Sequence, residues 1–265
     1  MEHLMNGDAH FEEGAFGAAI EEYTKAVILD PANPHAYFKR GLAYAELEQF
    51  DKAAEDYSKA LEFDPGNAAT YYKRGVAFHN TGMLAEAAED YSRAIDLDPD
   101  NGLAYNNRGI LRHRDGDVEG AIADYTRAIE INPGDSAAYT NRGFALQEKG
   151  DLELAIADCG KAIELDPASA VAYNNRGQIL RARIGQARTE ALADFSKAIE
   201  LDESYATAYA NRAAMYLEAG RDYDASLDFR AAAELDQRYA YGPGFATPQQ
   251  DEPDSPPAQT THTGP

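Results

Sequence analysis

Small, aromatic and polar residues follow one another along this chain in a pattern with a period of about 34 residues. In one copy, Tyr105 and Gly109 are four residues apart, and Ala121, Tyr125 and Ala128 follow at spacings of four and three. Such spacings place side chains on one face of an α-helix. A short polar turn that contains a glycine separates the two stretches. Each copy is therefore predicted to be a helix, a turn and a second helix.

Glycine and proline mark the ends of the predicted helices. A turn glycine can adopt the left-handed conformation that ends a helix, and it recurs at Gly14, Gly82, Gly116, Gly150, Gly185 and Gly220. A proline after the second helix pushes the preceding residue out of the helical region. This proline recurs at Pro31, Pro65, Pro99, Pro133 and Pro167. The last two copies carry Glu203 and Gln237 instead, and the sixth copy is two residues longer.

A second glycine lies inside the first helix of most copies, where glycine costs roughly 0.5–1 kcal/mol relative to alanine. We interpret it as a point of close approach between the two helices. In the copy above, Gly109 would face the small side chains Ala121 and Ala128.

These columns of aromatic, glycine, alanine and proline residues resemble the tetratricopeptide repeat (TPR), a helix–turn–helix unit of about 34 residues. Tyrosine stands where the family usually has tryptophan, and arginine where it has leucine before the glycine. The resemblance implies an all-α fold, a TPR-type α-solenoid of seven helix–turn–helix repeats in a right-handed superhelix, with a concave groove lined by the first helices. It covers 1–237, in repeats of about 1–33, 34–67, 68–101, 102–135, 136–169, 170–205 and 206–237.

The stretch 238–265 breaks the pattern. It holds six of the twelve prolines, so it is predicted to be a Pro-rich disordered tail that cannot bury enough surface to fold alone. A terminal repeat normally needs a cap. A further hypothesis is therefore that Tyr239, Tyr241 and Phe245 fold back over the exposed face of the last repeat.

The composition narrows the classes of function. A formal net charge of −22 disfavours binding to nucleic acids and to anionic membranes, and favours neutral or basic partners. The single cysteine excludes an intramolecular disulfide and a thiolate zinc site. Without a membrane-length apolar run or a secretory signal, a cytoplasmic location is expected. No phosphate-binding loop, nucleophile motif or metal-ligand spacing occurs, so we expect neither an enzyme nor a cofactor.

Two charged columns occur together in six copies. They are predicted to form bidentate ion pairs between the two helices of a repeat, and the alternative is a ladder of anion-binding arginines. The columns are Arg40, Arg74, Arg108, Arg142, Arg176 and Arg212 in the first helices, and Asp56, Asp90, Asp124, Asp158, Asp194 and Asp228 in the second. The turn between 176 and 188 is also rich in arginine. It would either bind an anion or be balanced by Asp194 and Glu190.

The other positions of the first helices are candidates for a peptide-binding groove. A polar column beside the arginines offers amide donors and acceptors that could hold a peptide backbone. Its alternative roles are a solvated wall or a hydrogen bond between neighbouring helices. With its neighbours, the predicted site consists of Lys39, Lys73, Asn106, Asn107, Ile110, His113, Asn141, Phe144, Asn175, Gln178 and Asn211.

Two more specific sites are disfavoured. Some members of the family bind acidic chaperone tails through a carboxylate clamp, but Asn106 and Ile110 stand where that clamp needs lysine and asparagine. His79 and His113 stand one repeat period apart, and only distant side chains could complete a metal site with them. We therefore expect no metal.

Together, these patterns predict a non-catalytic protein–protein interaction scaffold that binds a peptide, a helix or an extended partner segment in the concave groove. Two alternatives stay open at this point. The chain could be an adaptor subunit that presents substrates to a separate enzyme, or a self-assembling structural scaffold that stacks through its ends.

Overall fold

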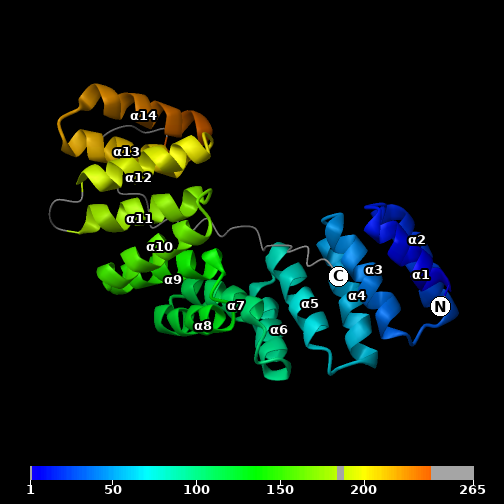
Figure 1. The fold of residues 1–265 in the computed structure, drawn as a ribbon. Coiled ribbons are helices and arrows are strands. Elements are labelled where there is room, and N and C mark those ends of the chain that lie inside the picture. Colours follow the sequence, from blue (N-terminus) through cyan, green and yellow to red (C-terminus); the bar gives the residue numbers. More distant parts are fainter. Residues whose placement is uncertain (1, 184–187, 240–265) are drawn as a thin grey trace. The chain divides into compact units, whose positions relative to one another are not determined.

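The computed structural model describes residues 2–183 and 188–239. These residues form fourteen α-helices and a final 3-10 turn, without a β-strand (Figure 1). The first helices of the repeats are α1 (Glu2–Glu12), α3 (Pro34–Glu46), α5 (Ala68–Asn80), α7 (Gly102–Arg114), α9 (Ser136–Lys149), α11 (Ala170–Ala182) and α13 (Ala206–Glu218). The second helices are α2 (Phe16–Leu29), α4 (Phe50–Phe63), α6 (Leu84–Leu97), α8 (Val118–Ile131), α10 (Leu152–Leu165), α12 (Arg188–Leu201) and α14 (Asp222–Leu235), followed by η1 (Gln237–Tyr239). The predicted all-α fold of seven helix pairs is confirmed.

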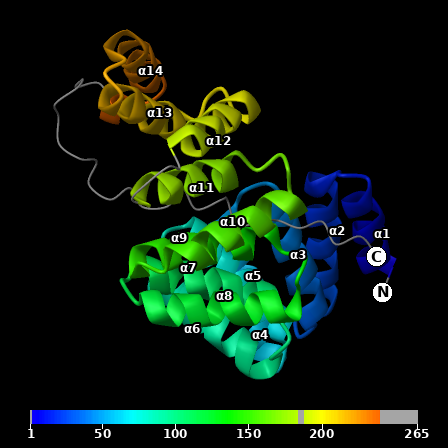
Figure 2. The ribbon, with the colours of Figure 1, turned by 60° about the vertical axis from the view of Figure 1, so that its left-hand side comes forward.

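The chain divides after Leu111, within α7, into two compact units, which are described separately. In the first unit, the helices from α1 to α6 each pack against the next helix in the chain. In the second, the helices from α8 to α14 do the same, and α9 also contacts α11. Figure 2 shows the same succession of neighbours within each unit from another side. Packing between repeats that are adjacent in sequence is the defining property of a solenoid.

The turns between the paired helices follow the predicted glycine pattern. The backbone φ angle is positive, between 70° and 93°, at Gly14, Gly82, Gly116, Gly150 and Gly220. Gly185 lies outside the described residues. The second repeat has Glu48 at this position, and it adopts the left-handed conformation with a φ of 56°.

The turn after each second helix depends on more than the predicted proline. An aspartate or asparagine ends the helix, and in six repeats its side chain accepts the backbone N–H two residues later, as Asp98 does from Asp100 at 3.2 Å. Asp202 and Asp236 make the same bond at 2.9 Å in the two repeats without proline. The turn therefore survives the loss of proline because the aspartate side chain closes it.

The glycine inside the first helix is a point of close approach, as predicted, but its neighbour differs from the expected alanines. A Cβ atom at Gly41 would lie 2.7 Å from the Tyr57 ring, and one at Gly177 would lie 2.7 Å from the Phe195 ring. These rings are fully buried. The glycine therefore makes room for the aromatic side chain of the second helix.

The last described residues turn back onto the final repeat. The Tyr239 hydroxyl lies 3.0 Å from the Thr207 hydroxyl of α13. The other residues of the predicted cap, Tyr241 and Phe245, lie outside the described residues, as does almost all of the predicted tail.

Candidate functional site

The charged columns form the braces that the sequence predicts. In five repeats the guanidinium donates two hydrogen bonds of 2.6 to 2.8 Å to the aspartate of the second helix. These pairs are Arg40–Asp56, Arg74–Asp90, Arg142–Asp158, Arg176–Asp194 and Arg212–Asp228. The guanidinium also lies over the tyrosine that precedes it in the first helix, as Arg142 does over Tyr139 at 5.7 Å. The arginines are thus engaged within the fold.

A hydroxyl column, absent from the predictions above, completes each brace. The remaining arm of Arg74 donates to the Ser58 hydroxyl of the preceding repeat at 3.1 Å. Arg40, Arg108, Arg142 and Arg212 make the same bond at 3.1 to 3.2 Å. The signal is visible in the sequence as serine or threonine directly after the second-helix aromatic residue. One arginine thereby ties three helices from two repeats.

The polar column of the predicted groove takes part in bonds between repeats. The Asn107 amide donates to the Tyr72 hydroxyl at 3.5 Å. The Asn211 amide donates to the Asn174 carbonyl oxygen at 3.0 Å. In both cases the acceptor stands at the same position of the preceding repeat. Asn107 and Asn211 therefore form hydrogen bonds between neighbouring helices, which is one of the alternative roles given above for this column.

Asn175 is the exception in this column. The residue at the corresponding acceptor position is Thr140, whose hydroxyl donates instead to the Ser136 backbone carbonyl at 2.9 Å. The Asn175 side chain has no hydrogen-bond partner among the described residues, although the residue is only 8% exposed. Its amide atoms are not fully buried, so they keep some contact with solvent and can be reached by a ligand.

The other predicted groove residues are placed in three ways. Asn106, Ile110 and His113 are buried within α7 or at its end. His113 lies 2.7 Å from the Glu148 carboxylate and meets the Phe144 ring edge-on at 5.3 Å. The remaining members, Lys39, Lys73, Asn141 and Gln178, are partly exposed on first helices.

The arginine-rich turn is balanced by carboxylates of neighbouring repeats. Arg181 lies 2.6 Å from Glu218, and Arg183 lies 3.0 Å from Glu153. Arg188 is 3.8 Å from Glu218. Exposed pairs of this kind contribute little to stability. The carboxylates that pair with these arginines are thus Glu153 and Glu218, whereas the sequence suggested Glu190.

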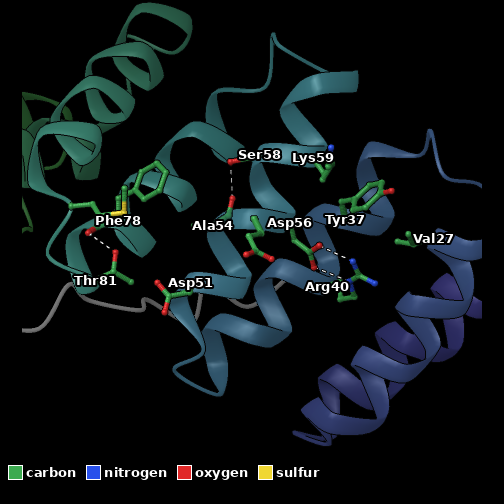
Figure 3. A pocket seen from close by; sticks show the side chains of 12 residues that line it. Val27, Tyr37, Arg40, Asp51, Ala54, Asp56, Ser58, Lys59, Phe78 and Thr81 are labelled. Carbon is green, nitrogen blue, oxygen red and sulfur yellow. Dashed lines mark hydrogen bonds and ion pairs between the residues drawn. The ribbon is translucent and has the colours of Figure 1, made fainter.

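A hollow of about 690 Å³ lies on the second-helix side of the first unit. Figure 3 shows that α4 supplies more of its labelled lining than any other helix, and that the Arg40 guanidinium points at the Asp56 carboxylate inside it. None of the predicted groove residues lines this hollow. The polar side chains of the hollow include Arg40 and Asp56, which already bind each other as a brace.

Two features are absent from the described part of the chain. No cluster of three or more histidine, cysteine, aspartate or glutamate side chains there could hold a metal ion. No helix among those described is long and apolar enough to cross a membrane.

Comparisons with known proteins agree with this architecture. Sequence models described as TPR repeat or tetratricopeptide repeat match residues 7–48 and 43–82, 70–136 and 136–169. A search of curated proteins found no match. Among solved structures, MamA is 30% identical with a TM-score of 0.58, and the match covers 63% of this chain and 92% of MamA.

Two further structures extend the comparison. YrrB, described as a TPR protein with an unusual peptide-binding site, is 26% identical with a TM-score of 0.59, over 70% of this chain and 95% of YrrB. A tetratricopeptide repeat protein from Parabacteroides merdae shares the fold at 20% identity, with a TM-score of 0.70 over 89% of this chain and 92% of its own. From the repeated helix pairs, the matching sequence models and these structures, the chain belongs to the tetratricopeptide repeat family.

Proposed function

We propose that this chain is a non-catalytic scaffold that holds an extended peptide segment of a partner protein along the first helices α9, α11 and α13. YrrB, which resembles it in sequence and structure, is described as having a peptide-binding site. The repeat itself serves many tasks, so the proposal rests on a specific side chain of this chain.

That side chain is Asn175, a nearly buried amide of α11 without a hydrogen-bond partner among the described residues. An amide offers a donor and an acceptor, and these match the C=O and N–H groups of an extended backbone. Each hydrogen bond between a peptide and this amide would contribute about 0.5–1.5 kcal/mol. Gln178, one helical turn further along α11 and partly exposed, would add a second amide.

The test uses a peptide selected from a random displayed library against the wild-type chain. Asn175→Ala should weaken that peptide at least about tenfold, which corresponds to one lost hydrogen bond pair. Thr140→Asn should weaken it as well, because it places an acceptor opposite Asn175, as Asn174 stands opposite Asn211. Isothermal titration calorimetry measures both affinities.

Asn211→Ala is the matched control. It removes the same side chain from the same column, but its main consequence should be a lower unfolding midpoint, since Asn211 already bonds to Asn174. Asn175→Ala should leave the unfolding midpoint unchanged. The proposal fails if the selected peptide binds the Asn175→Ala and wild-type chains with equal affinity.

A further inference from the structure

The hollow of the first unit presents apolar and acidic side chains together at one end. Figure 3 shows Phe78, Thr81 and Asp51 at the end drawn on the left. Met83 and Glu55 belong to the same lining. Asp51 and Glu55 are exposed, and Met83 is 41% exposed. The volume of about 690 Å³ lies within the range of about 300–1,000 Å³ that ligand clefts occupy. A side chain of another molecule can therefore reach this end and fit into it.

Two junctions of the second unit show what an acid at the Asp51 position does. Glu119 stands two repeat periods after Asp51 and pairs with Lys149 of the next repeat at 3.0 Å. Glu153 stands three periods after Asp51 and pairs with Arg183 of the next repeat, also at 3.0 Å. In both cases the second residue of a second helix meets a cation at the end of the following first helix.

The corresponding junction of the first unit keeps the acid and lacks the cation. Thr81 stands two periods before Lys149, and its hydroxyl donates to the Phe78 backbone carbonyl at 3.1 Å. Asp51 forms no ion pair with a described residue, and neither does Glu55, which lies one helical turn further along α4. Like charges at this spacing repel each other. The two carboxylates are therefore left without the counter-charge that their equivalents receive from within the fold.

The cations around the hollow are engaged elsewhere. Arg40 is bound in its brace, and Lys59 pairs with Glu62 at 2.8 Å. The Arg74 guanidinium lies 5.5 Å from the centre of the Phe78 ring, and its charge is balanced in its own brace. None of the three pairs with Asp51 or Glu55 in the part of the chain that the structure describes.

Met83 adds an exposed apolar group that its helix does not require. It is the N-cap residue of α6, and its side chain makes no capping hydrogen bond. One period later, Asp117 caps α8 by accepting the Gly120 backbone N–H at 3.0 Å. Polar residues are strongly preferred at an N-cap, so the methionine gives up a capping bond. A flexible thioether that lines the hollow with Phe78 suits adaptable contact with an incoming side chain.

We propose that this end of the hollow binds an arginine side chain of a partner protein. The guanidinium would pair with the carboxylates of Asp51 and Glu55, and its aliphatic stem would lie against Phe78 and Met83. Arginine fits better than lysine because its planar group bonds to two acceptors and packs on aromatic surfaces. The net charge of −22 attracts a basic segment. This surface is distinct from the peptide surface at Asn175 and goes beyond the proposed function.

The test uses the four methionines of the chain as NMR reporters, labelled with ¹³C at the methyl group. The probe is an acetylated, amidated tripeptide with arginine between two leucines. Its control carries citrulline, a neutral residue of almost the same shape, at equal ionic strength. The Met83 signal, assigned with Met83→Leu, should shift and saturate with the arginine peptide. The citrulline peptide should bind at least about fivefold more weakly, the value of two exposed ion pairs.

Two outcomes of this titration overturn the proposal. One is a Met83 signal that does not respond to the arginine peptide, and the other is an equal response to both peptides. The signal of Met215, which is buried in the second unit, should stay unchanged and serves as the internal reference. A lysine peptide should bind more weakly than the arginine peptide, and equal affinity would contradict the assignment of a guanidinium.

Variants of the lining test the origin of the site. Thr81→Lys supplies the cation that Lys149 supplies two periods later, so the arginine peptide should bind at least about fivefold more weakly. Asp51→Asn should weaken it about threefold. Glu21→Gln is the matched control, since it removes one charge at the first-repeat equivalent of Glu55 and lies outside the hollow. Circular dichroism verifies that each variant is folded.

The variants also separate a site from general attraction. Equal weakening by Asp51→Asn and Glu21→Gln would show that only the net charge attracts the peptide, and it would contradict the proposal. Undiminished binding to Thr81→Lys would contradict it as well. The reporter is Met83 of the first unit, whereas the proposed function is tested through Asn175 of the second unit. Failure of one test therefore leaves the other unaffected.

Discussion

The Arg74 and Arg176 braces are built to one plan, but only the first is complete. Arg74 binds Asp90 with two hydrogen bonds and reaches Ser58 of the preceding repeat with a third. Arg176 binds Asp194 in the same way, but Gly160 stands at the hydroxyl position. The Arg176 side chain is 27% exposed, compared with 20% for Arg74.

The second-helix ring differs at the same place. Tyr57 precedes Ser58 at the Arg74 junction, whereas the smaller Cys159 precedes Gly160 at the Arg176 junction. Both are fully buried. The difference indicates that a solenoid can keep its fold while one junction has fewer bonds and a smaller side chain, because each repeat contacts only its neighbours. We expect the junction between α10 and α11 to open more readily than the one between α4 and α5.

The largest effect on stability is expected from removing the aspartate carboxylate of a brace. Asp90→Ala leaves the largely buried Arg74 without its counter-charge and should destabilise the chain by about 3 kcal/mol, the lower end for a broken buried pair. Asp194→Ala should cost less, because Arg176 is more exposed. Urea denaturation, followed by circular dichroism, measures both. Glu89→Ala, at an exposed position of α6, is the control, and equal losses at Asp90 and Asp194 would remove the distinction between the braces.

A smaller effect is expected at the glycine under the ring. A Cβ atom at Gly75 would lie 2.8 Å from the Tyr91 ring. Gly75→Ala should therefore destabilise by about 2 kcal/mol through overpacking. Gly143→Ala meets the Cys159 sulfur at 2.9 Å and should cost less, because a thiol is more easily displaced than a packed ring. A larger loss at Gly143 than at Gly75 would show that the fifth repeat is as tightly packed as the third.

Removing a hydroxyl should make the complete brace resemble the incomplete one. Ser58→Ala takes away the third bond of Arg74 and should cost about 1 kcal/mol, the typical net value of a hydrogen bond. Hydrogen exchange should show faster opening of α5 and its neighbour α4. Ser196→Ala is a second instance, since Ser196 accepts from Arg212 at 3.1 Å. Unchanged exchange in both variants would show that the hydroxyl column does not strengthen the braces.

The smallest expected change is a gain. Gly160→Ser should give Arg176 the missing acceptor, and space is available because nothing lies within 4 Å of a Cβ atom at Gly160. We expect about 1 kcal/mol of stabilisation from the bond and from the removal of a mid-helix glycine. Gly160→Ala separates these two contributions, since it removes the mid-helix glycine without supplying a hydrogen-bond acceptor. A serine variant no more stable than the alanine variant would mean that Arg176 does not use the hydroxyl.

The fold was largely predictable because its signals are local and repeated. The period, the paired helices, the turn glycines and the aspartate–arginine braces all follow from spacings within one copy. The hydroxyl column is also visible in the sequence, but its role depends on the arginine of the following repeat. Glu48 shows the limit of such local signals, since the second repeat adopts the left-handed turn conformation without the glycine that would predict it.

The candidate site was less predictable because it depends on pairs of repeats. Asn107, Asn175 and Asn211 belong to one column of the sequence. Whether each amide is bonded depends on a residue 35 to 37 positions earlier, which is Tyr72, Thr140 or Asn174. The burial of Asn106 and Ile110 is likewise set by packing around α7 and not by the spacing within it. Such differences cannot be read from a single copy.

The buried cysteine of the fifth repeat has a practical consequence. Cys159 is the single thiol of the chain, it is fully buried, and burial raises its pKa to about 12. Its reactive thiolate form is therefore scarce at neutral pH, so an alkylating reagent reacts slowly with the closed structure. Because the thiol lies against Gly143 of α9 and packs with Ile179 of α11, the rate of alkylation measures how often α10 separates from these neighbouring helices. No reactive group has to be introduced for this measurement, because Cys159 is the single thiol of the chain.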